Sequence, residues 1–278
     1  KPDLDGFTDI DIPLEYNTDT LKRQAVVNAG VTFRLRNQVG DRFETMEFRY
    51  DNGIIDYVRE LAGEDTLTQP VFWQAERKGR DRADKEEYKV KLSVAFCFSN
   101  RVQRIEHYHN SSWLEHGGAP EKAVRSAFVS AIDGWLKQNG KYQRGESKIT
   151  FNDVQDALVL VSNNFSTQTS YENQTKKSIT NKFVQEAMTE FLRAQLEVYF
   201  IENPLDAEKV AGQVLVNKRS RETAEKTRLG IKKKLSGTLD IANRVQKFVA
   251  GRPRDLSRRV LDITGADSGR GRLQTATA

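Results

Sequence analysis

The chain has 278 residues, of which 37% are hydrophobic and 30% charged, and its formal net charge is +5. No apolar stretch reaches the roughly 20 residues that cross a bilayer, which excludes a helical membrane protein and predicts a cytoplasmic location without a membrane partner. Cys97 is the only cysteine, which excludes an intramolecular disulfide and a thiol-based zinc site. We therefore expect Cys97 to be a small, buried, apolar side chain.

Positive charge is concentrated toward the C-terminus. Residues 205–278 hold 17 Lys and Arg against 8 Asp and Glu, whereas the first 204 residues carry a small negative excess. A basic segment favours a polyanion as its partner, and nucleic acid is the commonest polyanion in the cytoplasm. A solvated helix surface explains the same charge equally well.

The first predicted strands form a hairpin. Residues 31–36 alternate apolar and polar side chains, residues 43–49 repeat a looser version of that alternation, and Gly40 lies between the two segments. This spacing is typical of two antiparallel strands joined by a tight turn.

The clearest strand covers residues 88–98, where every second side chain is apolar. We expect residues 102–108 to pair back with it across a turn at Ser99 and Asn100. Residues 158–161 form a continuous apolar run, which is typical of a strand buried on both faces.

Three helices follow from apolar spacing and proline positions. Pro120 begins a helix whose 3.6-residue stripe continues to Leu136, and residues 182–201 form a second amphipathic helix. Pro204 begins a third, which runs to about residue 235, is apolar early and strongly basic later. The overall prediction is a mixed α/β (α+β) chain with a long C-terminal helix, followed by a tail whose last ten residues are expected to be disordered.

A polar loop before the second long helix is the most informative segment. It reads Tyr171-Glu172-Asn173-Gln174-Thr175-Lys176-Lys177-Ser178. The Lys and Gln side chains are donors suited to a terminal phosphate, and Asn173 tolerates the positive φ that a sharp turn requires. A solvated surface loop is the simpler interpretation of these residues taken alone.

This loop resembles the Gln-Thr-Lys loop of bacterial type II (type IIA) DNA topoisomerase B subunits, the gyrase B and topoisomerase IV B family, whose usual glycine is Asn173 here. The resemblance extends over most of the chain. Segments similar to family sequences are Asp19–Arg23, Asn28–Val31, His116–Gly118, Glu202–Pro204 and Lys218–Glu222.

The resemblance implies a transducer domain with the fold of ribosomal protein S five domain 2, including a mixed sheet and a left-handed βαβ crossover. It implies that residues 1–12 end a GHKL-type ATPase domain, 13–235 form the transducer, and 236–278 are a linker toward a truncated or aberrant Toprim domain. The resemblance further implies that Lys176 contacts the γ-phosphate of ATP and that Gln174 assists, with Asn173 and Thr175 supporting the loop.

The resemblance also implies ATP and Mg²⁺ as cofactors of the parent enzyme, and double-stranded DNA, the topoisomerase A subunit and the chain's own ATPase and Toprim domains as partners. The family's ATP pocket precedes the position of Lys1, so this fragment alone is expected to bind ATP feebly and to hydrolyse none. The basic helix supplies the expected DNA contacts, which are Arg219, Arg221, Lys226, Arg228, Lys232, Lys233 and Lys234.

Two alternatives remain open at this point. The chain is also consistent with a non-catalytic nucleic-acid-binding or dimerisation module of a related GHKL ATPase. His107 and His109 share one face of a predicted strand, as metal ligands do, but no third ligand is evident, so we expect a strand surface and no metal site.

Overall fold

The computed structural model describes residues 5–6, 12–64 and 66–237, and the chain divides into two compact units, Lys1–Arg221 and Glu222–Ala278. Each unit is considered by itself. Much of the segments 1–12 and 236–278 lies outside the described residues. Among the residues that are described, no helix is long and apolar enough to cross a membrane.

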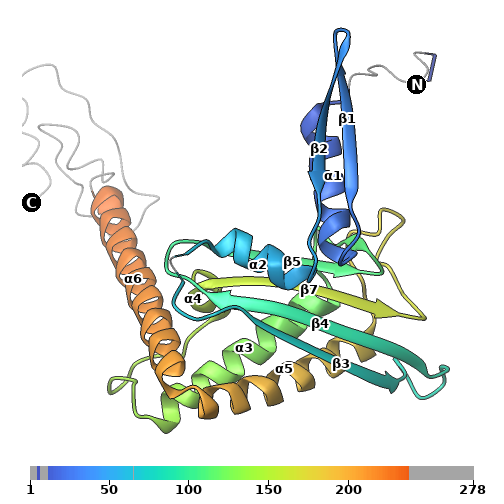
Figure 1. Ribbon diagram of the computed structural model, residues 1–278. Coiled ribbons are helices and arrows are strands. Elements are labelled where there is room, and N and C mark those ends of the chain that lie inside the picture. The colour runs from blue at the N-terminus through green and yellow to red at the C-terminus, as the bar shows by residue number, and fades with distance from the viewer. Residues whose placement is uncertain (1–4, 7–11, 65, 238–278) are drawn as a thin grey trace, which may run out of the picture. The chain divides into compact units, whose positions relative to one another are not determined.

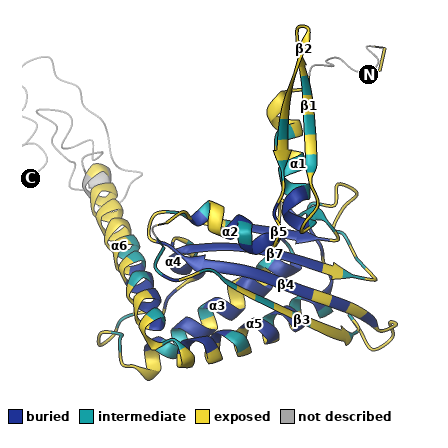
Figure 2. Ribbon diagram, in the orientation of Figure 1, coloured by how far each residue is buried: buried dark blue, intermediate teal, exposed yellow. Residues whose placement is uncertain are grey.

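The N-terminal elements are helix α1 (Leu14–Val27) and the antiparallel strands β1 (Phe33–Val39) and β2 (Arg42–Phe48). They form the predicted hairpin, and its turn contains Gly40 at φ 62°, a left-handed conformation that glycine adopts without strain. The two strands form a sheet of their own, most of whose residues are exposed or half-buried (Figure 2).

A five-stranded mixed sheet forms the centre of the first unit, in the order β3-β4-β7-β5-β6 (Figure 1). The strands are β3 (Val71–Gly79), β4 (Tyr88–Phe98), β5 (Arg104–His109), β6 (Ser112–Trp113) and β7 (Leu158–Ser166). β7 is antiparallel to β4 and parallel to β5. The predicted mixed sheet is therefore confirmed, while the left-handed sense of the crossover stays a prediction.

The prediction that residues 102–108 pair back with β4 is wrong. β3 and β7 occupy the two edges of β4, and β5 lies on the far side of β7. β7 is buried at every position from 158 to 164, so it needs a central place with both faces covered. Ser99 donates its main-chain N–H to the carbonyl of Ala157, which fixes the end of β4 beside the start of β7.

Helices α3 (Ala119–Gln138) and α5 (Lys182–Glu202) cover one face of the sheet, as their predicted apolar stripes require. Their side chains form the larger core with the alternate residues of β4 that run from Tyr88 to Phe98. Phe96 lies at its centre, with the rings of Trp73 and Phe128 at centroid distances of 4.8 and 5.3 Å. The tilted and edge-on ring contacts favour one packing arrangement over others.

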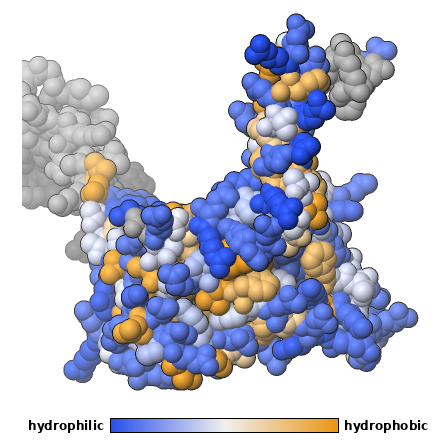
Figure 3. All heavy atoms as spheres, viewed as in Figure 1, coloured by the Kyte–Doolittle hydropathy of each residue, from blue (hydrophilic) through white to orange (hydrophobic). Residues whose placement is uncertain are grey.

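Helix α2 (Ile54–Ala62) packs on part of the opposite face, over a second core cluster that includes Ala95, Cys97, Val159 and Val161. Burial raises the pKa of the Cys97 thiol to about 12, which makes the side chain an unreactive apolar group, as predicted. Hydrophilic residues dominate the visible surface around these cores (Figure 3).

The remaining helices are the short α4 (Phe151–Gln155) and the long α6 (Pro204–Gly237). α6 confirms the predicted helix from Pro204 to about residue 235. Its early residues Ala207, Val210, Ala211 and Val214 are buried against the main core, whereas most later side chains are exposed.

Candidate functional site

The loop between β7 and α5 is attached to the rest of the unit at its stem. Tyr171 forms an isolated antiparallel β-bridge with Ile179 within the loop. Ile179 also forms an isolated parallel β-bridge with Gly118, just before α3. Gly118 has φ 86°, and a Cβ there would lie 2.3 Å from the carbonyl oxygen of Ile179. Only glycine permits this approach, so Gly118 serves the docking of the loop.

Asn181 fixes the other side of the stem. Its buried amide accepts a hydrogen bond from the main-chain N–H of Ser170 at 2.7 Å and donates to Asp81 at 3.0 Å. Asp81 lies just after β3 and also accepts the N–H of Phe183 in the first turn of α5. The loop is therefore fastened to the β3–β4 connection and to the start of α5.

The tip of the loop is exposed and tightly turned. The carboxamide oxygen of Asn173 accepts hydrogen bonds from the N–H and hydroxyl of Thr175, and its main-chain carbonyl accepts the N–H of Lys176 at 3.3 Å. Lys176 itself has φ 58°, whereas Asn173 does not have positive φ. Asn173 therefore does not adopt the positive φ that it tolerates: its side chain caps the turn, and Lys176 takes the left-handed conformation.

The two adjacent lysines have different surroundings. Lys177 forms an ion pair with Glu115, and its carbonyl accepts the N–H of His116. The exposed Lys176 extends its ammonium over the Tyr171 ring, 5.6 Å from the centroid, and makes no ion pair within the described part of the chain. Gln174 is also exposed. The loop thus exposes the Lys176 ammonium and the Gln174 carboxamide at its tip, whereas Lys177 is paired with Glu115.

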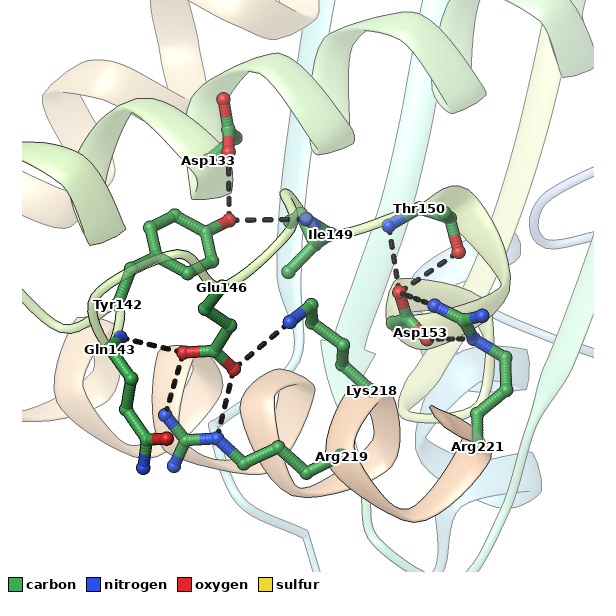
Figure 4. Close-up of polar contacts among 10 residues, drawn as sticks. All are labelled: Asp133, Tyr142, Gln143, Glu146, Ile149, Thr150, Asp153, Lys218, Arg219 and Arg221. Carbon is green, nitrogen blue, oxygen red and sulfur yellow. Dashed lines mark hydrogen bonds and ion pairs between the residues drawn. The ribbon is translucent and has the colours of Figure 1, made fainter. Parts of the chain in front are cut away.

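The early part of α6 carries cations that pair with acids of the α3–α4 region (Figure 4). Lys218 is fully buried and donates to Glu146 at 2.9 Å, while Arg219 contacts both oxygens of Glu146 at 3.0 and 3.1 Å. These donors, chiefly Arg219 and with it the N–H of Gln143, hold the pKa of Glu146 at about 2. Glu146 therefore stays ionised at neutral pH and joins α6 to the α3–α4 loop.

A second connection lies two residues further along α6, at Arg221. Arg221 contacts both oxygens of Asp153 at 2.6 and 3.1 Å. Asp153 is almost fully buried and also caps α4 by accepting the N–H and hydroxyl of Thr150. Although burial raises the pKa of Asp153, the hydrogen bonds from Arg221 and Thr150 lower it overall. Of the predicted DNA-contacting residues, Arg219 and Arg221 thus have intramolecular acidic partners.

The later part of α6 has a different character. Lys226, Arg228, Lys232 and Lys233 are exposed, and Arg228 pairs with Glu225 on its own helix at 2.8 Å. The side chain of Lys234 lies outside the described residues. DNA contact by these cations stays a prediction.

The prediction that His107 and His109 lie on a strand surface is wrong, because both are buried in the sheet. His107 Nδ1 lies 2.8 Å from the Ser162 hydroxyl, and His109 Nε2 lies 2.9 Å from that of Ser166. Burial lowers the pKa of each imidazole to about 4. No group of three or more His, Cys, Asp or Glu side chains within the described ranges could hold a metal ion.

Sequence reasoning missed Glu146, Asp153 and the buried role of Lys218. The Thr150-x-x-Asp153 spacing is a capping-box signature and could have located α4. Glu146 lies in a polar loop 72 residues before its partner Lys218, and no local pattern connects the two.

Comparison with protein families gives a match of residues 53–229 to the family described as DNA gyrase B. The B subunit of DNA gyrase from Campylobacter jejuni is 24% identical over 242 residues, which cover 86% of this chain and 30% of that protein. Its counterpart from Metamycoplasma arthritidis is 28% identical over 217 residues, covering 78% and 34%. The chain thus spans about a third of the length of these relatives.

Solved structures support the same fold. The ATPase domain of Thermus thermophilus gyrase B, in complex with an aminocoumarin, aligns with a TM-score of 0.60 at 23% identity, over 82% of this chain and 59% of that one. The topoisomerase IV ATP-binding domain of Francisella tularensis gives a TM-score of 0.60 at 19% identity, over 79% and 57%. At these identities the likeness shows the fold alone.

Proposed function

This chain belongs to the DNA gyrase B family, and from that premise we propose that it is the transducer part of a type II DNA topoisomerase B subunit. In the parent enzyme it couples ATP binding and hydrolysis to the passage of one DNA duplex through another. The observation that carries this proposal is the loop that ends in Lys176, which is fastened at its stem and bears an exposed cation at its tip.

Lys176 and Gln174 suit contact with a terminal phosphate. The ammonium and the carboxamide are both exposed, and each is a hydrogen-bond donor. The left-handed turn at Lys176 and the Asn173 cap restrict the tip, so less conformational freedom is lost when it binds. ATP bound to an ATPase domain would supply the phosphate, and Lys176 would donate to its oxygens as a point charge.

Loss of that phosphate removes the partner of Lys176 and changes which loop position is favoured. The stem transmits such a change because Asn181 joins the loop to Asp81 and to the start of α5. α5 ends at Glu202, and α6 begins at Pro204. The loop, α5 and α6 follow one another directly along the chain, so a movement of the loop can pass through α5 to α6.

The anchored base of α6 supports a lever role for this helix. Glu146 and Asp153 bind three of its cations from two different segments, which restricts both tilt and rotation of the base. The exposed cations Lys226 and Arg228 further along are available for phosphate contacts that do not depend on DNA sequence.

The cofactors and partners of this proposal belong to the parent enzyme. They are ATP with Mg²⁺, double-stranded DNA, the topoisomerase A subunit, and the ATPase and Toprim domains that accompany the transducer. We propose that the 278-residue chain by itself hydrolyses no ATP, since its proposed share in the reaction is a contact to the terminal phosphate.

Substitution of Lys176 in the full-length parent protein, assembled with the topoisomerase A subunit, tests the proposal. Lys176→Gln leaves a polar side chain that is one atom shorter and removes the charge. We expect ATP-dependent strand passage to fall by roughly 10²- to 10³-fold, because the cationic donor to the transferring phosphate is lost. A gel assay of DNA topology measures strand passage, and an assay of phosphate release measures ATP hydrolysis by the same preparation.

Lys182→Gln is the matched control, since Lys182 is an exposed lysine in the first turn of α5. We expect strand passage by this variant to match that of the unsubstituted enzyme. Unchanged ATP-dependent strand passage in Lys176→Gln would contradict the proposal and favour a nucleic-acid-binding module without nucleotide sensing.

A further inference from the structure

The sheet face that carries α2 is covered over only part of its length. The covered part ends near Asn163, whose amide donates to the carbonyl of Val27 at the end of α1. Beyond it, β3, β4 and β7 line a cavity of about 460 Å³ together with the turn after β5. Figure 2 shows exposed residues toward the ends of these strands. This volume is within the range of ordinary ligand pockets.

An aromatic ring and two lysines share the open face. Phe165 on β7 lies directly opposite Lys91 on β4, and directly opposite pairs project to the same side of a sheet. Lys89 lies two residues before Lys91 and therefore projects to that side too. Phe165 lines the cavity with 37% of its surface exposed, although β7 is a central strand.

Positive charge exceeds negative charge around the cavity. On the side of the sheet that carries Phe165, the lining includes three cations, Lys78, Lys89 and Lys91, and one acid, Glu76, which lies directly opposite Lys91. Lys78 pairs with Glu87 at 3.1 Å, whereas Lys89 and Lys91 have neither an ion pair nor a side-chain hydrogen bond within the described residues. Lys78 and Lys89 are also direct cross-strand neighbours, an unfavourable like-charge pair that a bound anion would relieve.

A second exposed aromatic residue lies on the same face. Phe72 on β3 is 43% exposed, and its cross-strand partner is Ala95. Ala95 lies four residues after Lys91, so it projects to the same side. From strand geometry the Phe72 and Phe165 positions are about 16 Å apart, a distance that several nucleotides of an extended strand can span.

We propose that this open face binds single-stranded nucleic acid, with a base stacked on Phe165 and phosphates beside Lys89 and Lys91. Exposed aromatic rings among cations on a sheet suit unpaired bases, which offer a flat apolar face and a charged backbone together. A duplex keeps its bases stacked inside and would leave Phe165 without a partner. An acidic peptide would satisfy the lysines and leave the ring equally unused.

The proposal is independent of nucleotide sensing, because no residue of the loop from Tyr171 to Ser178 lines the cavity. Binding is tested by fluorescence anisotropy, with the 278-residue chain and a labelled oligodeoxythymidine that cannot pair with itself. Phe165→Leu removes the ring but keeps an apolar side chain. We expect it to weaken binding about tenfold, since one stacked base is lost.

Phe43→Leu is the matched control, because Phe43 is an exposed aromatic residue of the hairpin, 54% exposed, outside the cavity. Its affinity is expected to equal that of the unsubstituted chain. Lys91→Gln is the second variant, and it should weaken binding several-fold. The salt dependence of its affinity should correspond to the release of about one counterion fewer. Circular dichroism verifies that all three variants fold.

Competition identifies the ligand. An unlabelled single strand should displace the probe, while an equal concentration of duplex or of polyglutamate should displace much less. Equal affinity of Phe165→Leu and the unsubstituted chain would overturn the proposal. Equal competition by duplex would also overturn it and assign the lysines to general phosphate binding.

Discussion

Side chains of the same residue type have different roles in this chain, depending on whether they are buried or exposed. Lys218 and Lys226 lie on one helix, yet Lys218 is fully buried against Glu146 and Lys226 is exposed. A buried charge without a partner costs several kcal/mol, while an exposed ion pair contributes about 0–1 kcal/mol. The buried groups therefore determine stability, and the exposed ones are free to bind ligands with little structural cost.

The largest expected effect is the removal of the Glu146 charge. Glu146→Gln breaks the ion pair between Glu146 and the fully buried ammonium of Lys218, so we expect the free energy of unfolding to fall by about 3–5 kcal/mol. Urea unfolding measures this change. Adding Lys218→Met should restore much of the loss, because an apolar side chain of similar length removes the buried ammonium; a double variant as unstable as Glu146→Gln would contradict this account.

The buried histidines come next. Their pKa is lowered to about 4, so the unfolded chain binds more protons than the folded chain below the ordinary value of 6.5. Stability is therefore full above pH 6.5 and declines as the pH falls toward 4. From pH 7 to pH 5 we expect a loss of roughly 3–4 kcal/mol for the two residues together, measured by urea unfolding at each pH.

Matched variants isolate this histidine effect. His107→Asn and His109→Gln each keep the position of the nitrogen that contacts the serine hydroxyl. The double variant should lose most of the pH dependence between pH 7 and pH 5, whereas a His116→Gln variant should retain it. An unchanged slope in the double variant would place the titrating groups elsewhere.

A smaller loss is expected for Asp153→Asn. The substitution removes a charge-assisted contact with Arg221 and weakens the α4 cap at Thr150, but Arg221 is 38% exposed and regains hydration. We expect a fall of about 2 kcal/mol in the free energy of unfolding. Asp156→Asn, at an exposed carboxylate just after α4, is the control and should change stability little; equal losses would refute the special role of Asp153.

The smallest change in stability is expected on the later part of α6. Replacing Lys226 and Arg228 by Gln should leave the free energy of unfolding nearly unchanged, because both side chains are exposed. The same variant should bind duplex DNA more weakly and reduce the salt dependence by about one counterion per lost phosphate contact. An unchanged salt dependence would exclude these two residues from the DNA contact.

Local patterns made much of the fold predictable. Alternation located β4 and the hairpin, and the 3.6-residue stripes located α3 and α5. The candidate loop was also recognisable, since its residues are contiguous in the chain. The strand after β4 was misplaced because alternation defines a strand and not its neighbour, and the continuous apolar run of β7 takes the central position.

The sequence by itself determined the helices α3, α5 and α6, most strands, the basic later part of α6 and the family resemblance, because each rests on residues close together in the chain. Only the tertiary structure decided that Lys176 takes the left-handed turn, that His107 and His109 are buried, and that the α6 base is held by acids. Those outcomes depend on contacts between residues distant in sequence, such as Glu146 with Lys218, whose energy comes from shared burial that no local pattern records.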